Sequence, residues 1–183
     1  MKFRIALLAL AICCPIAYAQ PSPGTMGTKA APAEVYDHLL SNLQREIVGA
    51  ADAMPADKYN FAPTQGDFKG VRTFGEQVRH LAESNYNYFK DWGAPNYVDP
   101  KSIEKLTSKD DIMKALRDSY AFAHAAMNTM TADNAFEQMG ARKQTRAGIA
   151  AFSMAHSMDH YGQLVEYLRM NGIIPPASRK SGM

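Results

Sequence analysis

The sequence contains little cysteine, and this scarcity limits the chemistry open to the folded protein. Its 183 residues include two cysteines, Cys13 and Cys14, and both lie in the first twenty positions. If that segment is removed, no thiol remains to form a disulfide or to act as a nucleophile. The folded part must then be held together by apolar packing, with or without the help of a metal ion.

A strong excess of one charge is also absent. The chain carries 20 Lys and Arg against 18 Asp and Glu, a formal net charge of +2. A protein that grips nucleic-acid phosphates needs a basic surface, so the composition argues against a nucleic-acid partner. Beyond the N-terminus, no apolar run approaches the length of about 20 residues that a membrane-spanning helix requires. We expect no transmembrane segment in the mature protein.

The first residues, 1–19, have the layout of a secretory signal peptide. Lys2 and Arg4 precede an apolar run, which ends in a small-residue cleavage motif at Ala19. Cleavage between Ala19 and Gln20 would leave a nearly neutral protein that is secreted or periplasmic. We prefer this interpretation to a lipoprotein signal, because a bulky isoleucine precedes Cys13 where a small residue is expected.

The rest of the chain has the pattern of one helical domain. Residues 20–32 are rich in Pro, Ser, Gly and Thr, which is typical of a flexible linker. The folded domain is expected over residues 33–176, with a short tail at 177–183. Four long segments carry a 3.6-residue apolar period and none alternates like a strand, so the predicted fold is an all-α four-helix bundle. The expected helices cover residues 33–54, 73–92, 108–130 and 145–171.

The connections between these helices are longer than in most bundles. If neighbouring helices alternate in direction, the connections 55–72 and 131–144 share the end of the bundle where the second and fourth helices begin. We expect a pocket at that end. Three aromatic residues of the first connection, Tyr59, Phe61 and Phe68, either plug this end of the bundle or line the entrance to the pocket, and plugging is the preferred interpretation.

The last helical segment carries the strongest chemical signal. His156 and His160 are four residues apart, so they lie on one face of a helix. That face is otherwise apolar, and an unpaired polar ring there would cost on the order of 1–3 kcal/mol. The two rings therefore need partners. In an ordinary core, the partners would be neighbouring carbonyls or the side chains of Gln163 and Tyr167. The other possible partner is a metal ion.

His80, in the second helical segment, is the best candidate for a third ligand. It lies on the flank of the apolar stripe of its helix, from which it can face either the bundle or water. Three neutral imidazoles suit a divalent ion such as Zn²⁺ or Ni²⁺ and leave a coordination position for water or substrate. The remaining histidines are assigned elsewhere, His38 to the solvent and His124 to the edge of the core.

These histidine segments resemble a known family of metal-binding bundles. The stretch 156–172, HSMDHYGQLVEYLRMNG, is similar to the last helix of the DinB-like (DNA-damage-inducible, YfiT-like) four-helix bundles. Residues 79–85 resemble the histidine segment on the second helix of that family, and residues 54–63 resemble the connection before it. The resemblance covers nearly all of the expected domain, from residue 33 to 176.

The resemblance implies that His80, His156 and His160 are the metal ligands. It further implies an activity like that of metal-dependent thiol transferases or a thiol-dependent isomerase. The chemistry of a bound metal suits a metal-dependent hydrolase or a thiol or other group transferase, acting on an unknown small-molecule substrate. The alternative is a non-catalytic, metal-stabilised binding module or stress-related protein with the same fold. An open fourth coordination position would favour catalysis, whereas a position closed by Gln163, Asp159 or a loop residue would favour a structural ion.

A second motif competes for the same pair of histidines. Residues 156–160 approximate the H-x-x-E-H motif of one class of metalloprotease, with Asp159 in place of the general-base glutamate. That class requires a carboxylate ligand far downstream, and the sequence ends at Met183, so we prefer the bundle-type site. In that site Asp159, Gln163 and Tyr167 are candidates to lie behind the ligands and orient them.

The last helical segment also has a second apolar face. A helix that is apolar on two sides must be covered twice. The long connections could wrap around it, and so could a second copy of the chain; a homodimer is slightly preferred. The second face consists of Met154, Met158, Tyr161, Val165 and Leu168.

Overall fold

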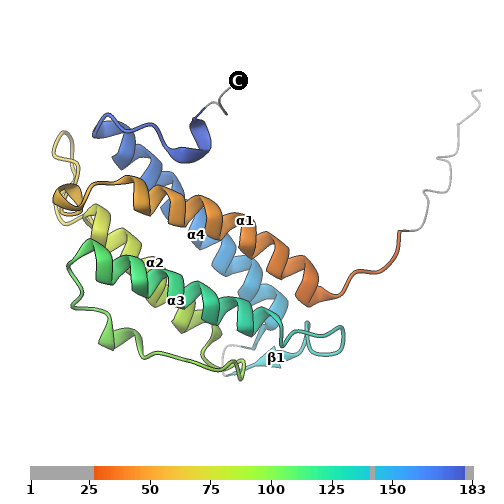
Figure 1. Ribbon diagram of the computed structural model, residues 1–183. Helices are drawn as coiled ribbons and strands as arrows, with labels where there is room; N and C mark the ends of the chain where they lie inside the picture. The colour runs from red at the N-terminus through yellow and green to blue at the C-terminus, as the bar shows by residue number, and fades with distance from the viewer. Residues whose placement is uncertain (1–26, 141–142, 180–183) are drawn as a thin grey trace, which may run out of the picture.

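The computed structural model describes residues 27–140 and 143–179, so the predicted signal peptide lies outside the described residues. The predicted all-α four-helix bundle is confirmed (Figure 1). Among the helices described, none is long and apolar enough to cross a membrane. The long helices are α1 (Pro32–Ala53), α2 (Phe74–Phe89), α3 (Lys109–Met127) and α4 (Arg146–Met170).

Side-chain caps fix the starts of three helices. Thr73, Ser108 and Thr145 precede α2, α3 and α4, and each accepts a hydrogen bond from the backbone N–H three residues further on. At α2 the cap is reciprocal, because the carboxylate of Glu76 accepts a hydrogen bond from the backbone N–H of Thr73 at 2.7 Å. Each such cap stabilises a helix by about 1 kcal/mol. The starts of these three helices therefore follow from local sequence.

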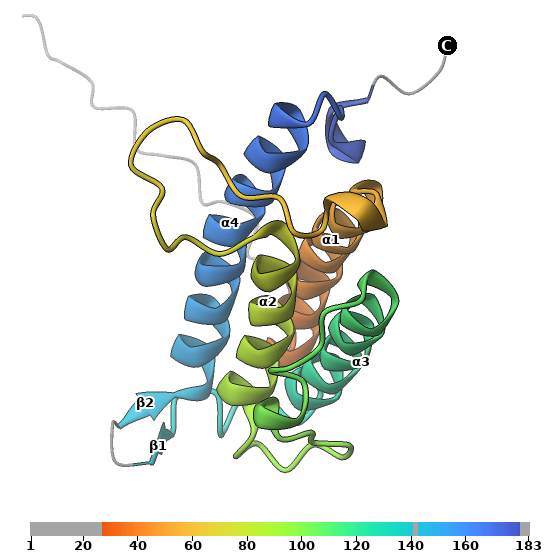
Figure 2. The same ribbon diagram turned by 90° about the vertical axis from the view of Figure 1, so that its left-hand side faces the viewer.

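The helices do not alternate in direction along the bundle. Asn85 of α2 donates a hydrogen bond to Ser119 of α3, and Gly75 near the start of α2 lies against Ile112 near the start of α3. These two helices are therefore parallel, and both run antiparallel to α1 and α4 (Figures 1 and 2). Residues 90–108, which include the short helix η2 (Pro100–Ser102), carry the chain back along the length of the bundle.

This up-down-down-up order corrects the expected position of the pocket. The hydroxyl of Tyr167, near the end of α4, donates a hydrogen bond to the carbonyl of Arg72, just before α2, at 3.1 Å. The second helix thus begins where the fourth ends. The connection 55–72 and the described part of the connection 131–144 consequently lie at opposite ends of the bundle, and the prediction that they share one end was wrong.

Short elements complete the two ends. One end holds η1 (Ala56–Lys58) and, packed against α1, η3 (Pro176–Ser178). The other end has an antiparallel pair, β1 (Gln138–Met139) and β2 (Gln144–Thr145), directly before α4. Two residues per strand are too few to produce an alternating pattern, so this pair was not expected from the sequence.

The aromatic residues of the first connection divide between the two expected roles. Tyr59 is 2% exposed and its hydroxyl donates a hydrogen bond to the carbonyl of Ala51, so it plugs the end of the bundle. Phe61 packs edge-on against Tyr167, with ring centroids 5.7 Å apart. Phe68 is 41% exposed and lines a cavity described below.

The second apolar face of α4 is covered mainly within the monomer. α1 packs against α4, and Leu168 is fully buried, while Met154 and Tyr161 pack against the edge of the core. Met158 alone among the large apolar residues of this face is strongly exposed, at 48%. A neighbouring helix therefore does most of the covering that the sequence had assigned to the connections or to a second copy. The homodimer stays a prediction.

Candidate metal centre

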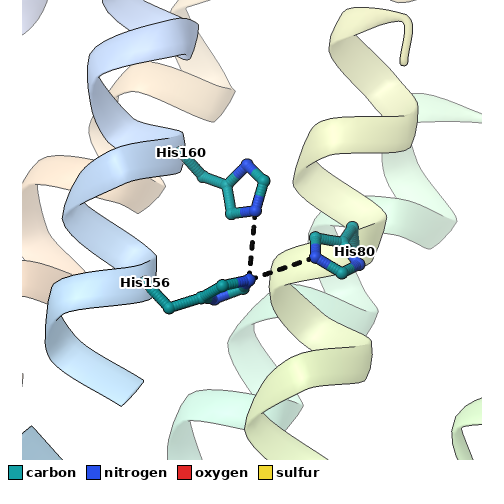
Figure 3. Close-up of side chains that lie close together, drawn as sticks. All are labelled: His80, His156 and His160. Carbon is teal, nitrogen blue, oxygen red and sulfur yellow. Dashed lines mark hydrogen bonds between the residues drawn. The ribbon is translucent and has the colours of Figure 1, made fainter. Parts of the chain in front are cut away.

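Three histidines from two antiparallel helices meet between α2 and α4. The Nε2 atom of His156 lies 3.2 Å from Nε2 of His80 and 3.1 Å from Nε2 of His160 (Figure 3). Ligand atoms of all three residues lie within 4.8 Å of one another. In a tetrahedral zinc site with Zn–N bonds of about 2.0–2.1 Å, the nitrogens are about 3.3 Å apart. The three rings thus fit a divalent ion, and in the metal-free protein the same distances allow N–H···N hydrogen bonds.

The rings converge because all three residues lie near the middle of α2 and α4, which pack side by side. His156 and His160 are one turn apart on α4 and project toward α2, where His80 faces them. On one side of the rings, Gln77 donates a hydrogen bond to Gln163. The structure thus brings together all three predicted ligands, and their binding of a metal stays a prediction.

The surroundings of the site favour neutral imidazoles. Burial, together with the neighbouring His156 and His80, lowers the pKa of His160 to about 4. Burial and then His80 also lower the pKa of His156, while Asp159 acts in the opposite direction. The Nδ1 atoms of His156 and His160 are buried and have no hydrogen-bond partner in the described part of the chain. Neutral rings present a free lone pair, so the site is ready for a metal at neutral pH.

The comparison with known protein families agrees with this geometry. A family model described as the DinB superfamily matches residues 39–164, which is more than half of the chain and includes all three histidines. The chain belongs to the DinB superfamily. The resemblance found in the histidine segments is thereby confirmed. Among curated proteins, no match was found.

This DinB-superfamily bundle has a carboxylate behind His80 that the sequence analysis missed. Oε2 of Glu83 lies 3.9 Å from Nδ1 of His80, and Oε1 lies 3.3 Å from Nε of Arg79. Arg79 also donates a hydrogen bond to the carbonyl of Leu106, which holds this group in place. Interaction with His80 lowers the pKa of Glu83, and Arg79 adds to this against the effect of burial. The charged carboxylate favours the tautomer that leaves Nε2 of His80 free for a metal.

Glu83→Gln should weaken divalent metal binding by about 10–100-fold, because the neutral amide no longer places a negative charge beside Nδ1 of His80. Competition between the purified protein and a chromophoric chelator for Zn²⁺ measures the change. Glu104→Gln, at an exposed position outside the site, is the matched control and should bind Zn²⁺ like the parent. Equal affinity in all three proteins would mean that Glu83 serves only to pair with Arg79.

The i, i+3 spacing of His80 and Glu83 is the signal from which this residue could have been found.

Two of the three residues expected behind the ligands, Gln163 and Asp159, form a polar chain with Gln77 beside the rings. Nε2 of Gln77 donates to Oε1 of Gln163 at 2.6 Å, and Nε2 of Gln163 donates to Oδ2 of Asp159 at 3.1 Å. Tyr167 donates to the carbonyl of Arg72. Within residues 27–140 and 143–179, no hydrogen bond links Asp159, Gln163 or Tyr167 to a histidine ring. Asp159 affects the site through its charge.

The remaining histidines lie outside the site, as predicted. His38 is exposed, and its Nε2 lies 3.3 Å from Nδ2 of Asn42. His124 is half-buried between α3 and α1, where Nδ1 lies 2.6 Å from Asp37 and Nε2 lies 2.7 Å from Gln44. This residue ties two helices together at the edge of the core.

Two cavities lie along the α2–α4 gap, one toward each end. Toward the β1–β2 pair, the Tyr88 ring packs edge-on against the rings of His156 and Phe152, with centroid distances of 5.6 Å and 5.8 Å. Tyr88 and Phe152 also line a cavity of about 740 Å³. Toward the other end, a cavity of about 520 Å³ lies between α4 and the connection 54–73. The side chain of His80 is 24% exposed, so the ring cluster reaches solvent.

Proposed function

We propose that this protein is an exported metalloprotein of the DinB superfamily in which His80, His156 and His160 hold one divalent ion. The observation that carries the proposal is the convergence of three Nε2 atoms in a gap that reaches solvent. Imidazole donors suit Zn²⁺ or Ni²⁺. Export is supported by the signal-peptide layout of residues 1–19, which is a property of the sequence alone.

We further propose that the ion is catalytic. In the described part of the chain, the cluster offers three ligand side chains, and the nearby amide of Gln163 is engaged by Gln77 and Asp159. Three protein ligands leave a position for a water molecule or a substrate. A metal bound there would lower the pKa of a water molecule or thiol at that position, which suits hydrolysis or group transfer on a small molecule.

The chain's own residues have three tasks in this scheme. Burial keeps the rings of His156 and His160 neutral, so that their Nε2 lone pairs are available. The carboxylate of Glu83, 3.9 Å from Nδ1 of His80, places a negative charge beside that ring. The hydrogen bond from Gln77 holds the amide of Gln163, which could otherwise close the open position.

A non-catalytic, metal-stabilised module is the alternative function. It is favoured by one observation, which is that the three ligands join α2 to α4, two helices that no short connection links. An ion at this point would cross-link the bundle even without turnover. The two functions differ in whether the ligand at the fourth coordination position of the metal can be exchanged.

Spectroscopy of the Co²⁺-loaded protein distinguishes the two functions. We expect Co²⁺ to give visible absorption bands typical of a low-coordinate site, and 2-mercaptoethanol to change these bands and add a sulfur-to-metal charge-transfer band. Bands that resist both the thiol and azide would indicate a closed, structural site and contradict catalysis. The absence of any Co²⁺ bands at saturating metal would contradict the metal site itself.

A further inference from the structure

We infer that the cavity between α4 and the connection 54–73 receives the apolar part of a small-molecule substrate, whose metal-binding group lies at the histidine cluster. This inference rests on the proposed function and adds a substrate class to it. The class is an uncharged or cationic molecule with a metal-binding group at one end and an apolar body.

Two separate segments of the chain give this cavity apolar walls. Phe68 and Val71 come from the connection and Met170 from α4, and they are 41%, 37% and 52% exposed. Pro63 completes the apolar wall. Apolar side chains gathered around a concave surface mark a binding site more often than scattered ones. A volume of about 520 Å³ falls within the range of about 300–1,000 Å³ that is typical of small-molecule sites.

The polar side of the cavity adjoins the metal centre. Gln163, which lines the cavity, follows His160 by three residues, and its partner Gln77 precedes His80 by three residues on the antiparallel helix. The bonded amides are thus about 4.5 Å along the helix axes from the imidazoles, or about one turn. Gln77 is 3% exposed, and its Oε1 has no hydrogen-bond partner in the described residues. In the proposed complex, this buried acceptor would accept a hydrogen bond from an N–H or O–H group of the ligand that lies between its apolar body and its metal-binding group.

The charges on the lining restrict the ligand further. Asp159 and Glu166 line the cavity, and no basic side chain is part of its lining. Arg72, which follows Val71 in the chain, is exposed and is not part of the lining. The charge of Arg72 nevertheless acts on the His156 and His160 rings. One nearby cation thus stands against two lining carboxylates, and a negatively charged group in the body of the ligand would be disfavoured.

Alkyl hydroxamates test this assignment on the Zn²⁺-loaded protein, because the hydroxamate group binds the metal and the alkyl chain can enter the cavity. We expect octanohydroxamate to bind more tightly than acetohydroxamate, by about fourfold for each methylene that is buried. The analogue with a carboxylate at the end of the chain should bind more weakly than octanohydroxamate. Calorimetry measures the affinity of each ligand, and the quantity compared is the ratio of the octanohydroxamate affinity to the acetohydroxamate affinity. A change in metal affinity alone affects both ligands equally and does not change this ratio.

Val71→Asp should reduce this ratio several-fold, because it places a third carboxylate in the apolar wall. Phe152→Ala, in the cavity near the β1–β2 pair, should retain the ratio, and so should Phe136→Ala, which replaces an exposed aromatic side chain outside both cavity linings. A ratio lost in Phe152→Ala and retained in Val71→Asp would move the ligand to the other cavity and overturn the inference.

The proposed function and this inference fail in different ways. A ratio near one in the parent protein, with acetohydroxamate still bound, would overturn the inference and leave the metal site intact. The same ratio, together with a dimer that Val71→Asp dissociates, would assign the apolar wall to a second copy of the chain and also overturn the inference. Protein that takes up no metal would overturn the proposed function, and the inference with it.

Discussion

His156→Ala should remove most of the thermal stabilisation that a divalent metal gives this protein. A ligand at a thousand times its dissociation constant stabilises the folded state by about 4 kcal/mol, which raises the melting temperature of a domain of this size by about 10 °C. Nε2 of His156 lies within 3.2 Å of both other Nε2 atoms, so this residue is central to the site. Loss of one ligand costs about 3 kcal/mol, or at least 100-fold in affinity. The stabilisation should fall to about 1 kcal/mol.

Scanning calorimetry with Zn²⁺ and with a chelator measures this effect. With the chelator, the variant and the parent should melt at similar temperatures. The substitution loses the packing of the imidazole but also removes the cost of holding a polar ring in a crowded, partly buried position. His38→Ala, which removes an exposed histidine of α1, should respond to Zn²⁺ like the parent. If His156→Ala lowers the melting temperature equally with and without metal, His156 is an ordinary core residue and the metal site is wrong.

The metal-free protein should lose stability as the pH falls from about 6.5 toward 4. The pKa of His160 is lowered to about 4 in the folded protein, while the ordinary value of about 6.5 applies to the unfolded chain. Between these values the unfolded chain binds a proton that the folded protein does not, so the free energy of unfolding decreases with falling pH. The loss is at most about 3 kcal/mol and ends near pH 4. The lowered pKa of His156 adds to it in the same direction.

Urea denaturation with a chelator present, at pH 7 and at pH 4.5, measures this dependence. Carboxylates also titrate toward the lower pH, so the comparison must be made with metal-free His160→Gln, which retains them. The stability of the variant should depend less steeply on pH than that of the parent. Parallel pH profiles for the two proteins would show that His160 titrates at its ordinary pKa and contradict this prediction.

The helices and the ligand set could be predicted because they depend on local sequence. Thr73 with Glu76 marks the start of α2, and the four-residue spacing of His156 and His160 places both rings on one face whatever the rest of the chain does. His80 was placed with them under the assumption that the second and fourth helices run in the same direction. The three rings still meet because all lie near the middle of their helices, where a reversal of direction changes their level only slightly.

The direction of α3 could not be predicted, because it depends on the path of residues 90–108. A connection of that length can turn at one end of a bundle or return along its side. The choice is made by packing between distant residues, such as Asn85 with Ser119, which no local pattern records. Glu83 was missed for a related reason. A carboxylate on a helix normally faces water, and only the position of Arg79 against Leu106 shows that this one is held beside His80.

The last helix, α4, supplies two of the three candidate ligands. A chain emerging from the ribosome presents His80 long before His156 and His160, so an incomplete polypeptide lacks the triad. If residues 1–19 direct the chain across a membrane during translation, as proposed above, the triad assembles only on the far side. The ion would then be drawn from the supply of that compartment, and its identity would be set there rather than in the cytosol.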